Sequence, residues 1–269
     1  MKQGGAKMTI IEEVFNKVPA WATFDHTVLI GYRGSDAHGT KLTTDENKFD
    51  DIDVFSIVIQ PIEFYLGLHN NGKKRQHWDT SGDHLDILVY DFRKFMRLAA
   101  AGNPNTLAWL WNIPNHYLYN TIFGEILIDN RELFLSKEIF NRLHGYARAQ
   151  MHRMTSFQKY EGYMGEKRKT LVDEHGYDIK NAAHVIRLLL MAKELGERET
   201  LYSLRPNNEA ELIKDIKRGK FTIDVIQDMI NQLIFETGEA ERKSNLPETL
   251  DFDKISKMTH DIITAFNGY

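Results

Sequence analysis

The chain has 269 residues, of which 42% are hydrophobic and 27% charged, an ordinary composition for a globular protein of one large or two modest domains. It has no cysteine, which excludes disulfides, thiolate zinc sites and cysteine nucleophiles. Its net charge of −4 excludes a polycation that coats nucleic acid with its whole surface. The N-terminus lacks the apolar segment of a secretory signal, and no apolar run approaches the ~20 residues that span a bilayer. We therefore expect a cytoplasmic protein with no membrane contact.

The first half of the chain alternates short β-rich runs with turns. Residues 27–30 predict a buried strand that ends at Gly31. Residues 52–59 and 84–90 predict two further strands of the same apolar kind.

Two helices are expected directly after the third strand. Asp91 precedes apolar positions with helical spacing and is expected to cap a helix over residues 92–101. Asn103 is followed by a proline at the first helical position, which predicts a second helix over residues 104–111.

The second half of the chain has helical patterns to its end. Ser136 is expected to cap a helix over residues 137–159, and Asp178 a strongly apolar helix that ends near residue 195. Further helices are expected over residues 209–218, 222–239 and 252–266. The sequence thus predicts an α+β fold, with a strand-containing domain over residues 1–125 and an all-helical domain over residues 126–269.

One segment carries a charge opposite to that of the chain. Residues 140–170 hold seven Arg or Lys and two Glu. A local positive excess on an acidic chain is consistent with a phosphate-binding surface, and we consider residues 148–169 a candidate RNA-binding surface. A solvated helix face explains the same composition equally well.

Gly34-Ser35 follows the first predicted strand. A glycine lets the backbone turn sharply, and a serine at the start of a helix offers its hydroxyl and backbone N–H groups to a triphosphate. The dipeptide alone is a weak signal, because Gly-Ser occurs in many turns.

Three aspartates lie at the starts of the second and third predicted strands. Asp51 and Asp53 alternate with Ile52 and so share one face, where paired carboxylates suit Mg²⁺ or Mn²⁺; a solvated acidic loop is the alternative. Asp86 stands alone in an otherwise apolar strand, where a charge is costly unless it is paired or binds a metal.

The partner of Asp86 is open at this point. If its strand neighbours the second strand, three carboxylates converge and can hold two divalent cations ~3.5–4 Å apart. A structural ion pair with Arg93 or Lys94 is the alternative.

This order of motifs resembles the nucleotidyltransferases of the DNA-polymerase-β superfamily, and more closely the RlaP (YcgL-like) family, which is associated with RNA repair. The resemblance covers roughly residues 27–235. Besides Gly34-Ser35 and the three aspartates, the resemblance rests on further segments in both halves of the chain. These are Asp91-Phe92-Arg93-Lys94-Phe95, Gly102-Asn103-Pro104-Asn105, Phe134-Leu135-Ser136, Tyr146-Ala147, Gln150, Lys180 and Ala183-His184-Val185-Ile186-Arg187-Leu188-Leu189.

The resemblance implies a polymerase-β-like head, a mixed sheet with helices, followed by an all-helical C-terminal domain. It places Gly34 and Ser35 at the nucleotide phosphates. It makes Asp51 and Asp53 ligands of both metal ions. Asp86 becomes the third ligand and helps to activate the acceptor hydroxyl.

The implied activity is a Mg²⁺- or Mn²⁺-dependent transfer of an NMP from an NTP to a hydroxyl acceptor, with RNA favoured by the basic segment. Two positions depart from the family pattern: Asp50 replaces a serine, and His38 replaces an aromatic residue before a loop glycine. A nucleotide-binding regulatory module without catalysis, and a toxin–antitoxin-type enzyme that modifies a protein, remain as alternatives.

A cationic stripe follows one face of the helix capped by Asp178. Lys180, His184, Arg187 and Met191 are spaced four, three and four residues apart. We expect Lys180 and Arg187, with His184 between them, to bind the triphosphate or an RNA phosphate. The competing explanation is ion pairs with carboxylates of neighbouring helices, for instance in the segment from Glu209 to Asp215.

Overall fold

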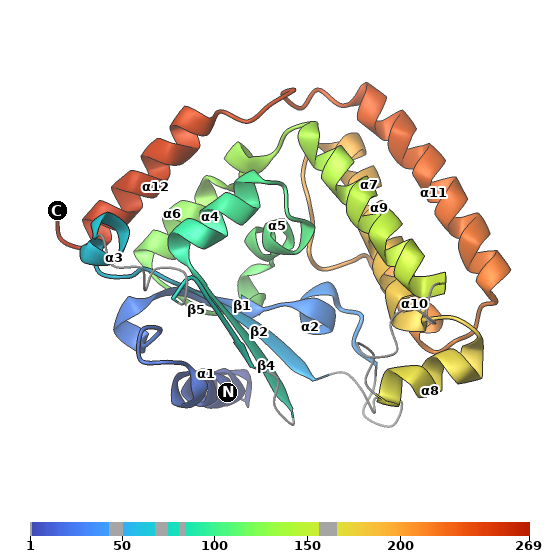
Figure 1. Ribbon diagram of the computed structural model, residues 1–269, viewed down its shortest axis with the longest axis horizontal. Coiled ribbons are helices and arrows are strands. Elements are labelled where there is room, and N and C mark those ends of the chain that lie inside the picture. Colours follow the sequence, from blue (N-terminus) through green and yellow to red (C-terminus); the bar gives the residue numbers. More distant parts are fainter. Residues whose placement is uncertain (1, 43–50, 68–74, 81–83, 156–165) are drawn as a thin grey trace. The chain divides into compact units, whose positions relative to one another are not determined.

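The computed structural model describes residues 2–42, 51–67, 75–80, 84–155 and 166–269 (Figure 1). The chain forms two compact units. The first consists of Met1–His38, Asp51–Phe134 and Leu250–Tyr269, and the second of Gly39–Asp50 and Leu135–Thr249. Within the described residues, no helix is both long and apolar enough to cross a bilayer.

The first unit contains a five-stranded mixed sheet. Its strands lie in the order β3 (His77–Thr80), β4 (Leu85–Asp91), β2 (Ile52–Val58), β1 (Thr27–Tyr32) and β5 (Tyr117–Asn120). Strands β2 and β4 are parallel, and every other pair is antiparallel. The three predicted strands are confirmed as β1, β2 and β4, and they form the middle of the sheet.

Helices cover both faces of this sheet (Figure 1). Helix α1 (Lys2–Lys17) packs its apolar residues against one face, in a core that includes Val54 of β2 and Ile87 of β4. The opposite face carries α4 (Phe92–Ala100) and α5 (Pro104–Leu110). There the ring of Phe55 stacks on Trp109, with centroids 4.4 Å apart.

The predicted caps of α4 and α5 are confirmed. The Asp91 carboxylate accepts the backbone N–H of Lys94 at 3.2 Å, and the Asn103 side chain accepts those of Asn105 and Thr106 at 3.1 Å. Both helices therefore begin where side-chain oxygens satisfy N–H groups that have no intrahelical partner.

The first unit also contains a long C-terminal helix, α12 (Phe252–Phe266). Its remaining elements are short: η1 (Phe24–His26), α2 (Gly34–His38), α3 (Ile62–Leu66), η3 (Pro114–His116), α6 (Ile122–Asp129) and η4 (Arg131–Phe134).

The division into units differs from the predicted boundary between residues 125 and 126. The sheet-containing unit continues to Phe134 because α6 packs against β1 and β5, and η4 packs against α6 and α12. Helix α12 also joins this unit: it packs against α4, and its Phe266 ring meets Phe123 of α6 at 5.3 Å. Packing partners distant in sequence define this boundary, so local patterns do not reveal it.

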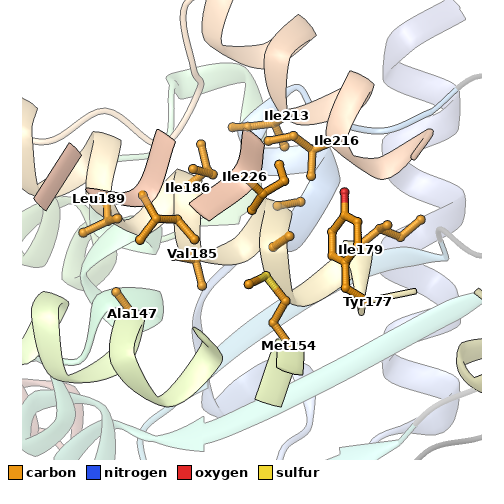
Figure 2. Close-up of a cluster of buried hydrophobic side chains, with 13 residues drawn as sticks. Ala147, Met154, Tyr177, Ile179, Val185, Ile186, Leu189, Ile213, Ile216 and Ile226 are labelled. Carbon is orange, nitrogen blue, oxygen red and sulfur yellow. The ribbon is translucent and has the colours of Figure 1, made fainter. Parts of the chain in front are cut away.

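The second unit is helical. It consists of α7 (Glu138–Thr155), α8 (Glu166–His175), α9 (Ile179–Arg198), α10 (Asn207–Lys217) and α11 (Ile223–Lys243). Helix α9 packs against each of the other four. Figure 2 shows the core that results, with Val185 and Ile186 of α9 close to Ile213 of α10 and Ile226 of α11.

The four helices predicted for this unit are confirmed, with one change of capping. Asp178 caps α9 as expected, accepting the Asn181 N–H at 3.0 Å. Ser136 does not cap α7 with its side chain: its buried hydroxyl has no hydrogen-bond partner among the described residues, and its carbonyl accepts the Ile139 N–H instead. The predicted end of this helix at residue 159 lies outside the described residues.

Candidate active site

Two of the predicted carboxylates lie side by side. The parallel pairing of β2 and β4 makes Asp53 and Asp86 direct partners in register. Paired residues of neighbouring strands project to the same face of a sheet. Strand alternation places both on the face that carries Phe55, opposite the face covered by α1.

Asp51 lies immediately before β2, two residues ahead of Asp53. The backbone N–H of the intervening Ile52 donates to the His84 carbonyl at 2.9 Å and continues the pairing with the strand beside it. Within the described residues, however, no three His, Asp or Glu side chains are grouped as a metal ligand set. The structure places Asp53 and Asp86 in register, and a metal site made by Asp51, Asp53 and Asp86 together stays a prediction.

The turn between β1 and α2 packs directly against Asp53. Gly34 opens α2 with a φ of +61°, a left-handed conformation that favours glycine. A Cβ at this position would lie 2.3 Å from Oδ2 of Asp53, so no other residue fits without displacing the carboxylate. The expected sharp turn into a helix at Gly34-Ser35 is confirmed, and it lies beside an acidic residue of the site.

Arg33 binds the same carboxylate from the other side, and the sequence reasoning missed it. Its Nη2 lies 2.9 Å from Oδ1 of Asp53, while its Nε donates to the Val54 carbonyl at 3.2 Å. Its backbone N–H donates to the Asp53 carbonyl at 2.9 Å. The sequence feature that could have indicated this role is the position of a basic residue, Arg33, immediately before Gly34-Ser35.

Asp86 does not take part in the alternative ion pair. Its Oδ1 is buried and has no hydrogen-bond partner among the described residues. Within that part of the chain neither Arg93 nor Lys94 pairs with it, and the Arg93 guanidinium lies over the Tyr65 ring, 5.2 Å from the centroid. A buried carboxylate oxygen without a donor is costly, which is consistent with a ligand-binding role.

Residues that follow α5 contact Tyr32, the last residue of β1, which immediately precedes Arg33. Asn112 is buried and donates its amide to the Tyr32 carbonyl at 2.8 Å. The His116 ring packs edge-on against Tyr32, with centroids 6.0 Å apart. Burial lowers the pKa of His116, although the nearby Asp36 carboxylate acts in the opposite direction.

The cationic stripe of α9 is present as predicted, and Arg187 is buried with 5% of its surface exposed. Its guanidinium contacts Met191 Sδ at 3.0 Å and His184 Nδ1 at 3.5 Å. Burial, together with Arg205, lowers the pKa of Arg187 to about 10. Lys180 is half-buried two turns before Arg187. These residues belong to the second unit, and their assignment to nucleotide binding stays a prediction.

The candidate RNA-binding surface is described only in part. Helix α7 covers its beginning, residues 156–165 lie outside the described residues, and α8 carries Lys167, Arg168 and Lys169 near its start.

Comparison with known proteins identifies the family of the chain. The sequence profile of RlaP, described as the RNA repair pathway DNA polymerase beta family, matches residues 22–252. The chain is therefore a nucleotidyltransferase with a polymerase-β-type head. It belongs to the RlaP family.

The other comparisons give little beyond this assignment. None of the curated proteins matches the chain. Among solved structures, the chain is similar to a nucleotidyltransferase-like protein from Exiguobacterium sibiricum 255-15, with 8% identity and a TM-score of 0.31. The match covers 98% of this chain and 77% of that protein.

Proposed function

We propose that the protein transfers a nucleoside monophosphate from an NTP to a hydroxyl group of RNA, with a divalent cation, Mg²⁺ or Mn²⁺, at Asp51, Asp53 and Asp86. The observation that carries this proposal is the register of Asp53 with Asp86 across two parallel strands. The donor set fits such an ion, because carboxylate oxygens are its preferred ligands and Oδ1 of Asp86 is buried without a protein donor among the described residues.

The reaction exchanges a phosphoanhydride bond of the NTP for a phosphoester bond to the acceptor. The acceptor oxygen forms a bond to the α-phosphorus, the bond from that phosphorus to the bridging oxygen breaks, and pyrophosphate departs. The proton of the acceptor hydroxyl passes to Asp86, whose Oδ1 has no hydrogen-bond partner among the described residues. When bound, the cation supplies positive charge to the phosphates and to the departing oxygen.

Gly34 and Ser35 hold the phosphates in this proposal. Gly34 brings the backbone close to Asp53, so phosphates bound along this turn lie next to the carboxylates. Ser35 is half-buried in the first turn of α2 and contributes its hydroxyl. Lys180, His184 and Arg187 supply the further positive charge that a triphosphate requires.

RNA is the proposed acceptor for two reasons. The description of the family refers to an RNA repair pathway. The excess of Arg and Lys over residues 148–169 supplies positive charge for a nucleic-acid backbone on an otherwise acidic chain.

The test is incubation with each labelled NTP, Mg²⁺ and either total RNA or a cell lysate, followed by identification of the labelled product. We expect label in RNA, and a loss of at least about a hundredfold in Asp86→Asn because a proton acceptor is removed. Asp79→Asn is the matched control, since Asp79 is exposed on the neighbouring strand β3. Label in protein would replace RNA as the acceptor, and no label with any NTP would contradict the proposed transfer.

A further inference from the structure

The Arg33 guanidinium contacts Asp53, one of the carboxylates to which the proposed function assigns a divalent cation. Asp53 is held between Arg33, which contacts Oδ1, and the backbone of Gly34, which lies against Oδ2. The guanidinium contributes a positive charge and a directed hydrogen bond at 2.9 Å. A divalent cation would need the same carboxylate oxygens.

The Arg33–Asp53 ion pair is neither fully buried nor freely solvated. The two side chains are 26% and 25% exposed. Both groups keep some access to water, so separating them leaves neither charge fully buried, and we expect the net strength of the pair to lie between those of exposed and buried ion pairs. The carboxylate can therefore change partners.

Arg33 has two other contacts with β2, one from its side chain and one from its backbone. Its Nε donates to the Val54 carbonyl, and its backbone N–H donates to the Asp53 carbonyl. The second of these bonds does not involve the side chain. The guanidinium can thus leave Asp53 while the backbone of Arg33 remains attached to β2.

We propose that Arg33 is a built-in counterion that competes with the divalent cation for Asp53. The inference rests on the proposed function and adds a control element to the same site. In the absence of the cation, Arg33 neutralises Asp53 and keeps the carboxylate in place against Gly34. Cation binding then requires Arg33 to give up this contact, which lowers the affinity of the free protein for the metal. Arg33 acts through Asp53 and is therefore a positioning residue.

The proposal is tested by titrating Mn²⁺ alone into the full-length protein and measuring bound metal by calorimetry and by electron paramagnetic resonance. Arg33→Gln should bind Mn²⁺ about three- to fivefold more tightly, because a partly exposed ion pair no longer has to be broken. Arg33→Lys, which keeps the charge, should bind close to wild type. Thermal melting of each variant establishes that it is folded.

Two controls separate local competition from other effects. Arg97→Gln removes the same charge from an exposed position on α4, where the described residues include no ion-pair partner, and should leave Mn²⁺ affinity unchanged. Asp53→Asn should abolish the binding that Arg33→Gln strengthens.

The outcomes are distinguishable. If wild type binds Mn²⁺ through Asp53 but Arg33→Gln binds equally or more weakly, the counterion role is wrong and the proposed function stands. An equal gain in Arg97→Gln would also overturn it, because overall charge would then explain the effect. If wild type binds no Mn²⁺ even with a non-hydrolysable NTP analogue, both the metal site of the proposed function and this inference are wrong.

Discussion

Asp91 is the residue whose environment most clearly couples stability to pH. Its carboxyl is fully buried, accepts the Tyr65 hydroxyl at 2.6 Å and caps α4. Burial raises the pKa of Asp91 to about 6 from an ordinary value of 3.8, against the opposing effect of these hydrogen bonds. The folded protein therefore binds this proton more tightly than the unfolded chain does.

The direction of the pH dependence follows from this difference. The stabilisation from protonated Asp91 is complete below about pH 4, declines between about pH 4 and 6, and is absent above that range, with a total of up to ~3 kcal/mol. Asp91→Asn keeps the capping oxygen but cannot ionise. We expect the free energy of unfolding of wild type, minus that of the variant, to fall across this window and then level off.

Urea unfolding at a series of pH values measures this difference, in which the titration of other carboxylates cancels. If the free energies of unfolding of the two proteins changed in parallel with pH, Asp91 would not be the source of the predicted pH dependence.

The carboxylates of the site were predictable, whereas their cationic neighbour was not. Asp53 and Asp86 each interrupt an apolar strand, and that local conflict is visible in the sequence. Arg33 shows no such conflict, because an arginine after a strand is ordinary. Its role depends on the antiparallel register that pairs Tyr32 with Val54 and so brings Arg33 beside Asp53, and only the fold supplies this information.

At the scale of elements, a buried ion-pair network joins α9 to α10. The Arg205 side chain is fully buried and lies 2.9 Å from Glu194 of α9 and 2.6 Å from Glu209 of α10. Glu194 is 8% exposed, so it cannot turn to water if Arg205 is removed. The network therefore fixes the segment between the two helices.

Arg205→Met should destabilise the protein by roughly 3–5 kcal/mol, because it leaves the buried Glu194 carboxylate uncompensated. Lys214→Met removes a cation from an i,i+3 pair with Glu211, whose side chain is 60% exposed, and should cost less than about 1 kcal/mol. Urea unfolding followed by circular dichroism compares the two variants. Equal losses would mean that burial of Arg205 adds nothing to the strength of the network.

The elements that were predicted share strong local signals. Helix α9 has a long apolar face and a capping aspartate, and β2 is a continuous apolar run. The elements that were missed lack such signals: β3 and β5 are four-residue edge strands, and the sequence of α8 is mostly polar. Helix α1 carries a glycine pair near its start, which weakens its pattern although its later residues pack against the sheet.

At the scale of the whole molecule, charge is the property that limits how RNA can bind. The chain has a net charge of −4, so its average field repels a polyanion. RNA binding must therefore depend on a local excess of positive charge. Within the candidate RNA-binding surface, the basic residues are most closely spaced at Lys167, Arg168 and Lys169. These residues follow one another at the start of α8.

If this surface binds RNA, affinity must fall steeply with salt, because each neutralised phosphate releases counterions. Replacing Lys167, Arg168 and Lys169 with alanine should flatten the plot of log affinity against log salt by roughly two units, at about 0.7 for each lost contact with single-stranded RNA. The matched control replaces Lys243, Lys254 and Lys257, which are exposed elsewhere and change the net charge equally. Fluorescence anisotropy with a labelled RNA between low and physiological salt gives both slopes. A wild-type slope in the first variant, or the same flattening in the control, would remove this surface as the RNA site and leave a protein or small molecule as the acceptor to be tested.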